Sequence, residues 1–114
     1  MSQSEALIHE TYICNLEDIL IGTGVCALVG EEEVAVFKTS AGVFAVSNMD
    51  PFTQAQVISR GLIGETEGRY YVASPLHKQR FDLQTGVCFE DDLVALKVFE
   101  VQLDEQKKSI FITA

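Results

Sequence analysis

Two short stretches of the sequence carry candidate ligand positions, and His77 in the second is the one plausible metal ligand there. The first reads Asn-Met-Asp-Pro-Phe and ends at Phe52, and the second reads Ser-Pro-Leu-His and ends at His77. Asp50 and Ser74, each followed by a proline, lie 24 residues apart. Carboxylate, hydroxyl and imidazole groups can all ligate metals. His77 alone does not make a site, because protein metal sites use three or four protein ligands.

The stretch around His77 also carries positive charge. Lys78 and Arg80 follow His77 on a chain that is acidic as a whole. A charged loop tip can assist recognition of a protein partner, so His77, Lys78 and Arg80 are candidate partner contacts. The alternative is that His77 is an exposed loop residue with no special role. No Ser-His-Asp or Cys-His catalytic set is indicated, because the chain has two histidines and its cysteines lie in strand-like runs.

The three cysteines do not form a recognisable metal-binding motif. Cys14, Cys26 and Cys88 are odd in number, lack Cys-x-x-Cys spacing and have apolar neighbours. This pattern argues against a disulfide framework and against a cysteine-only zinc or iron–sulfur site. We predict buried, reduced core thiols in a cytoplasmic protein.

The rest of the chain, which must position the two stretches, is typical of β structure. Short apolar runs recur at a spacing of roughly 8–12 residues with turn residues between them, and no long amphipathic helix is indicated. Strands are expected at 11–14, 25–29, 34–37, 43–46, 70–73, 97–103 and 109–113. Residues 34–37 are apolar throughout and are expected to be covered on both faces. The fold class predicted is all-β, an antiparallel sandwich or partial barrel in which the two candidate stretches are hairpin loops.

Several turns are also predicted. Residues 82–86 close the second stretch with a turn that ends in Gly86. Residues 47–60 read as a loop, and the acidic run from Glu90 to Asp92 reads as a solvated turn. The glycines between residues 61 and 68 are expected at strand ends and turns. A phosphate loop is disfavoured because no Gly-Lys-Ser/Thr follows them.

Composition limits the kinds of partner. With 114 residues, 47% hydrophobic and 22% charged, the chain suits one globular domain. We place this domain at residues 11–114, after a flexible lead-in at residues 1–10. The net charge of −9 argues against nucleic acid and against an anionic membrane surface. No apolar run approaches the roughly 18 residues that a membrane span requires.

The two stretches and the Arg-Phe-Asp-Leu-Gln-Thr-Gly run after the second resemble a Rieske domain. Rieske loops carry Cys-x-His and Cys-x-x-His, which hold a [2Fe–2S] cluster with two thiolates and two imidazoles. Carried onto this sequence, the ligand positions fall on Asp50, Phe52, Ser74 and His77. Three of these four side chains differ from the family's ligands, while Pro51 and Pro75 are present. The resemblance therefore implies a Rieske-like fold without the cluster, and no cofactor or metal in this chain.

Among Rieske-like proteins, a chain of this length without the ligands resembles the small subunits of bacterial NAD(P)H-dependent nitrite reductases of the assimilatory type, which serve nitrate assimilation. The resemblance implies a non-redox subunit that docks on a large subunit. The large subunit would carry FAD, a [4Fe–4S] cluster and sirohaem and reduce nitrite to ammonium. Two alternatives are a Rieske-type ferredoxin that carries electrons to a dioxygenase and a stand-alone β binding module.

Overall fold

The computed structural model describes residues 10–104 and 106–113 and has the predicted all-β fold. Residues 1–9, most of the predicted lead-in, lie outside the described part, and Glu10 is the first residue of β1. The strands and the two 3₁₀ turns (η) are β1 (Glu10–Asn15), η2 (Leu16–Asp18), β2 (Thr23–Val29), β3 (Glu32–Thr39), β4 (Gly42–Ser47), β5 (Met49–Asp50), β6 (Ala55–Gln56), η3 (Ile58–Arg60), β7 (Leu62–Thr66), β8 (Arg69–Ala73), β9 (Arg80–Asp82), β10 (Val98–Leu103) and β11 (Ser109–Thr113).

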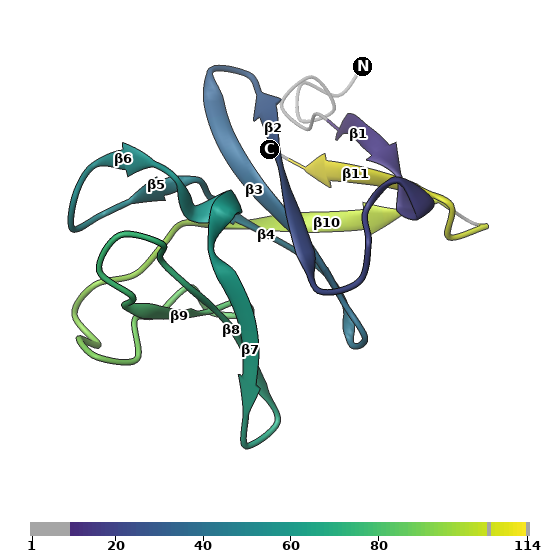
Figure 1. Ribbon diagram of the computed structural model, residues 1–114. Helices are drawn as coiled ribbons and strands as arrows, with labels where there is room; N and C mark the ends of the chain where they lie inside the picture. Colours follow the sequence, from purple (N-terminus) through teal and green to yellow (C-terminus); the bar gives the residue numbers. More distant parts are fainter. Residues whose placement is uncertain (1–9, 105, 114) are drawn as a thin grey trace, which may run out of the picture.

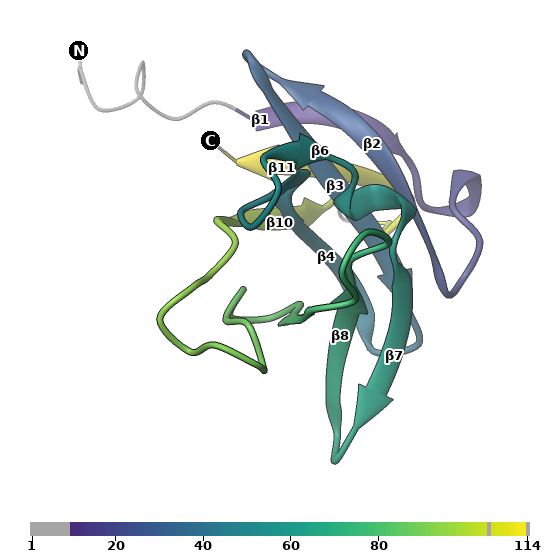
Figure 2. The ribbon, with the colours of Figure 1, turned by 60° about the vertical axis from the view of Figure 1, so that its left-hand side comes forward.

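The strands form three antiparallel sheets. The largest has the order β1-β11-β10-β4-β3-β2 and curls into a nearly closed barrel (Figure 1). The smaller sheets are β5-β6 and β7-β8-β9, and Figure 2 shows the β7–β8 hairpin extending away from the barrel. The predicted partial barrel is confirmed. Both predicted loops are hairpin loops, because β5 pairs with β6 and β8 pairs with β9.

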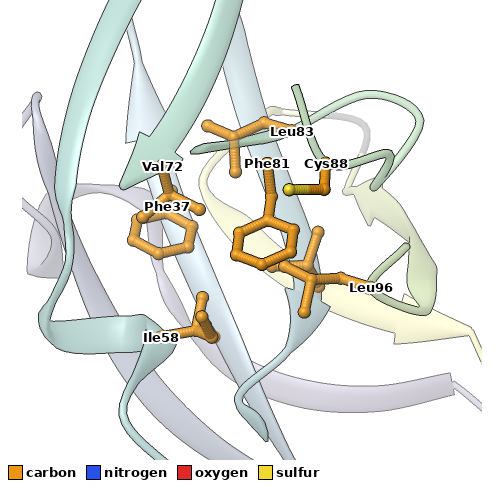
Figure 3. Close-up of a cluster of buried hydrophobic side chains, with 9 residues drawn as sticks. Phe37, Ile58, Val72, Phe81, Leu83, Cys88 and Leu96 are labelled. Atoms are coloured by element: carbon orange, nitrogen blue, oxygen red, sulfur yellow. The ribbon is translucent and has the colours of Figure 1, made fainter. Parts of the chain in front are cut away.

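Strand β3 separates two hydrophobic cores, which explains its uninterrupted apolar run. Val34 and Val36 pack inside the barrel with residues such as Ile110. Ala35 and Phe37 point to the opposite face because side chains alternate along a strand. They pack in a second core with residues of the β7-β8-β9 sheet such as Phe81, with η3 and with the long loop between β9 and β10 (Figure 3). The prediction that residues 34–37 are covered on both faces is confirmed, since all four are fully buried.

Two features of the segment from 47 to 68 differ from the predictions. The expected loop at 47–60 contains the two-residue strands β5 and β6 and the 3₁₀ turn η3. Elements this short leave no hydrophobic period in a sequence. Gly64 lies inside β7 rather than at a strand end. A glycine is needed there because the ring of Tyr71 occupies the space into which a Cβ would project.

The prediction for the cysteines is right for Cys88 and wrong for Cys26. All three described thiols are free, but Cys88 is buried, Cys14 is half-buried and Cys26 is exposed. Cys26 lies on β2, which is an edge strand of the large sheet, so an apolar neighbourhood in sequence did not mean burial in space. Burial first, and then the charge of Asp18, raise the pKa of the Cys14 thiol.

The turn predicted at 82–86 is confirmed. The carboxylate of Asp82 accepts the backbone N–H groups of Gln84 (2.7 Å) and Thr85 (3.0 Å) and pairs with the guanidinium of Arg69 (2.9 Å). Gly86 closes the turn with a φ of 82°, which favours glycine.

In the described part of the chain, no helix has the length and hydrophobicity needed to cross a membrane.

Candidate functional site

The β5–β6 loop is fixed at its base by Asn48, a residue to which the sequence analysis gave no role. The buried Asn48 side chain donates to Glu33 Oε1 (3.1 Å) and accepts the Ser59 N–H (2.7 Å). Its backbone bonds to Glu33 O (3.0 Å) and to the Ile58 N–H (3.0 Å). Asn48 therefore ties both ends of the loop to β3 and η3. The sequence feature that could have indicated this role is the tendency of asparagine in turns to form hydrogen bonds with backbone groups.

Within this loop, Asp50 organises the chain after it. Its Oδ1 accepts the N–H of Phe52 (2.8 Å), and its backbone carbonyl accepts the N–H of Gln54 (2.6 Å). Gln54 has a left-handed φ of 61°, which is uncommon for a residue with a side chain. Pro51, at the second position of the loop, disfavours the helical backbone conformation for the preceding residue, Asp50.

The β8–β9 loop repeats the same local structure. Ser74 Oγ accepts the N–H of Leu76 (3.3 Å), and the Ser74 carbonyl accepts the N–H of Lys78 (3.0 Å). Pro75 holds the second position, and Lys78 has a left-handed φ of 64°. Asp50 and Ser74 therefore occupy matching places in two similar loops.

The two loops meet through these matching residues. Ser74 Oγ donates a hydrogen bond of 2.5 Å to Asp50 Oδ2, and both side chains are buried. Two of the positions that correspond to Rieske cluster ligands, 24 residues apart in the sequence, are thus in direct contact. A buried carboxylate is stabilised only when hydrogen-bond donors surround it. Here the Ser74 hydroxyl and the Phe52 N–H supply the donors.

The other two predicted positions lie nearer the surface. Phe52 is 40% exposed, and its ring centroid is 6.2 Å from that of the buried Phe81. His77 and Lys78 are exposed, as is Leu76 (48%). The paired loops thus end in a tip that combines apolar surface, an imidazole and an ammonium group. We call the exposed residues Phe52, Leu76, His77 and Lys78 the loop tip.

Arg80, the third predicted partner contact, is engaged within the chain. Its Nε lies 2.7 Å from Glu90 Oε2, and its backbone N–H donates to Glu90 Oε1 (2.8 Å). The hydrogen bond and charge of Glu90 raise the pKa of Arg80. Burial raises the pKa of Glu90, but the backbone and side-chain hydrogen bonds from Arg80 outweigh burial and lower it. The prediction of a solvated turn at Glu90 to Asp92 is confirmed, since all three residues are exposed, and the Glu90 carboxylate also pairs with Arg80 of β9.

The donor set of the loops does not fit a Rieske cluster. Such a cluster needs two thiolates on one iron and two imidazoles on the other. Asp50 and Ser74 offer oxygen atoms that are already bonded to each other, and Phe52 offers no donor atom. Within residues 10–104 and 106–113, no three His, Cys, Asp or Glu side chains gather as a possible metal site.

Comparison with known proteins agrees with this architecture. The family described as "Rieske-like [2Fe-2S] domain" matches residues 11–111. The nitrite reductase (NADH) small subunit of Salmonella typhimurium is 53% identical over 95 residues, covering 82% of this chain and 88% of that protein. The solution structure of the nitrite reductase [NAD(P)H] small subunit of Erwinia carotovora is 43% identical with a TM-score of 0.74, covering 92% of this chain and 82% of that one.

A further relative is much longer than this chain. The nitrite reductase [NAD(P)H] large subunit of Klebsiella oxytoca is 36% identical over 95 residues, which cover 83% of this chain and 10% of that protein. A domain similar to this chain thus occurs inside a large-subunit polypeptide.

The curled six-stranded sheet, the two matching hairpin loops and the family match define a Rieske-like domain protein. Within that class, the chain belongs to the family of nitrite reductase (NADH) small subunits. The resemblance noted in the sequence is confirmed at the level of fold and family.

Proposed function

We propose that this chain is a non-redox subunit of a cytoplasmic nitrite reductase and that it docks on the large subunit through the loop tip. The large subunit would hold FAD, sirohaem and a [4Fe–4S] cluster and would use NAD(P)H to reduce nitrite to ammonium. The small chain would supply binding surface and no electron carrier. The observation that carries the proposal is the Asp50–Ser74 hydrogen bond at the place where the family's loops hold iron.

The loops support a role in binding because hydrogen bonds within the chain hold their shape. Each loop contains one non-glycine residue whose backbone is in the left-handed conformation, Gln54 in the first loop and Lys78 in the second. Such conformations cost free energy and persist where the surrounding structure enforces them. The Asn48 and Asp50 hydrogen bonds provide that enforcement in the first loop.

The surface of the loop tip suits a protein partner. Phe52 and Leu76 expose apolar area beside the exposed side chains of His77 and Lys78. Aromatic and aliphatic anchors with a few flanking charges are common at protein interfaces. The Klebsiella oxytoca relative supports the choice of partner, because in that protein a domain similar to this chain is part of the same polypeptide as the rest of the large subunit.

The proposal is tested by co-expression of this chain with the large subunit and separation on a sizing column at micromolar concentration. We expect a stable complex with the unmodified chain. Leu76→Asp should weaken the complex at least roughly tenfold, since a charge in an apolar contact costs about 1–3 kcal/mol. Leu93→Asp changes an almost fully exposed leucine on a different turn and serves as the control. Separate elution of the unmodified chains would refute the docking role.

The non-redox role has its own measurement. The folded chain, purified and incubated with iron and sulfide under reducing conditions, should show no visible absorption and no bound iron. Stoichiometric iron and sulfide in the folded protein would instead favour the ferredoxin alternative. A folded, colourless chain that binds no large subunit would favour a stand-alone β binding module.

A further inference from the structure

A second surface feature lies at the opposite end of the barrel from the loop tip. Figure 1 shows η2 and the β10–β11 turn on the right, far from β5 and β6 on the left. Between η2, β3 and this turn lies a pocket of about 350 Å³. Its lining residues are Leu16, Glu17, Lys38, Lys107 and Lys108. We call it the lysine pocket.

The lysine pocket is held together by the backbone of Leu16. The N–H of Leu16 donates to the Lys108 carbonyl (2.6 Å), and the Leu16 carbonyl accepts from Lys38 Nζ (2.9 Å). Asp104 fixes the backbone of the β10–β11 turn at a lining residue, because its Oδ1 accepts the N–H of Lys108 (2.7 Å). That backbone hydrogen bond is the largest influence that lowers the pKa of Asp104. Three separate elements are thus fixed around one opening.

Positive charge is concentrated here on an acidic chain. The chain has eight lysines and arginines and a net charge of −9, yet three of the eight line this pocket. The ion pairs found among the described residues join Arg69 to Asp82, Arg80 to Glu90 and Lys97 to Glu32, and none uses a pocket lysine. Glu17 is the one acidic side chain in the lining.

Two features distinguish this pocket from a phosphate cradle. A cradle presents free backbone N–H groups, whereas the N–H groups of Leu16, Lys107 and Lys108 are already bonded inside the chain. The loop from η2 to β2 also exposes apolar side chains, Leu20 (74%) and Ile21 (63%). This loop is joined to β3 at Lys38, one of the lining residues, because the Gly22 N–H donates to the Lys38 carbonyl (2.7 Å). Flexible ammonium groups beside exposed aliphatic side chains fit a protein segment better than a compact anion.

We infer that the lysine pocket, with Leu20 and Ile21, is a second contact surface for the large subunit and takes an acidic segment that also carries an apolar side chain. This inference rests on the proposed function, because it assumes the same partner. Lys107 and Lys108 attract the acidic side chains, and Leu20 and Ile21 cover the apolar one. Contacts at both ends of the domain would fix its orientation on the partner, which a single tip contact would leave free to rotate.

The inference is tested by measuring the affinity of the full chain for the purified large subunit. The double variant Lys107→Gln and Lys108→Gln removes two exposed charges from the pocket. The control pair, Gln84→Glu and Gln102→Glu, changes net charge by the same amount at exposed positions elsewhere. We expect the pocket variant to bind roughly 3- to 10-fold more weakly than the control at about 50 mM salt, with the difference shrinking at about 500 mM because salt screens exposed charges.

A variant that binds the large subunit more tightly gives a second test, because a misfolded variant would bind it more weakly. Glu17→Gln removes the acidic side chain from the lining and should tighten binding roughly twofold or more at low salt. If the unmodified chain binds while pocket and control variants bind equally and Glu17→Gln has no effect, the second contact is refuted and the proposed function stands. If the unmodified chain does not bind the large subunit, both are refuted.

Discussion

The buried hydrogen bond between Ser74 and Asp50 gives a quantitative prediction about stability. Ser74→Ala removes one oxygen and leaves Asp50 Oδ2 without its donor in a buried position. Hydrogen bonds to charged groups contribute about 1.5–3 kcal/mol, and an unsatisfied buried acceptor costs a similar amount. The second bond to Ser74 Oγ, from the Leu76 N–H, is longer at 3.3 Å and adds little. We expect the free energy of unfolding to fall by about 2–3 kcal/mol.

The assay is urea unfolding followed by circular dichroism, with thermal unfolding as a second measure. For a chain of this size, 2–3 kcal/mol lowers the melting temperature by roughly 8–18 °C. Ser40→Ala is the matched control, because it also removes a serine hydroxyl that bonds to another side chain, here the Tyr70 hydroxyl at an exposed position. That control should cost less than about 1 kcal/mol.

A double-mutant cycle separates the Ser74–Asp50 bond from other effects. Asp50→Ala also loses the bond to the Phe52 N–H, but the cycle cancels this contribution. The coupling energy between Asp50→Ala and Ser74→Ala should be about 1.5–3 kcal/mol. Additive effects within about 0.5 kcal/mol, or a Ser74→Ala cost no larger than the control, would refute the claim that this bond joins the two loops.

Three other predictions follow from the same structure. Gly86→Ala should destabilise the fold by at least about 2 kcal/mol in urea unfolding, because a Cβ at this left-handed residue would overlap the Leu96 carbonyl oxygen; a neutral result would contradict the turn geometry. Burial raises the pKa of Asp82, but its backbone and Arg69 hydrogen bonds outweigh burial and lower it. The unfolded chain therefore binds this proton more readily, so the contribution of Asp82 is complete above an unfolded pKa of about 3.9 and is lost as the pH falls through the lower folded value. Asp82→Asn should accordingly be less stable than the unmodified chain at neutral pH and differ progressively less below about pH 4, as measured by unfolding across pH; a constant difference would argue against the charge. Finally, since the two loops have the same backbone form, iron and sulfide reconstitution should give visible absorption after the combined changes Asp50→Cys, Phe52→His and Ser74→Cys, and a folded but iron-free variant would count against preserved loop geometry.

The sequence predicted the framework of the site because its signals are local. Pro51 and Pro75 fix the chain where each loop begins, and Gly86 ends the turn that follows the second loop. The apolar run at 34–37 predicted a strand covered on both faces, which the two cores confirm. These features depend on residues adjacent in sequence, so pattern and propensity suffice to find them.

Local pattern misled where solvent exposure depended on sheet order. Cys26 has apolar neighbours like those of Cys88, but it lies on an edge strand and is exposed. The acidic run at Glu90 to Asp92 is exposed as predicted, but the sequence did not indicate that Arg80 would pair with Glu90. Sheet order and strand register decide such cases, and neither is encoded in a short window of sequence.

The sequence by itself determined seven of the strands (β1 to β4, β8, β10 and β11), the two proline-bearing loops and the kinds of side chain that each loop presents. Only the tertiary structure decided that Asp50 bonds to Ser74, that Asn48 holds the base of the first loop, and that lysines from β3 and the β10–β11 turn share one pocket with η2. The physical reason is that a strand or turn is stabilised mainly by residues close in the chain, whereas each of these contacts joins segments brought together by the pairing of distant strands.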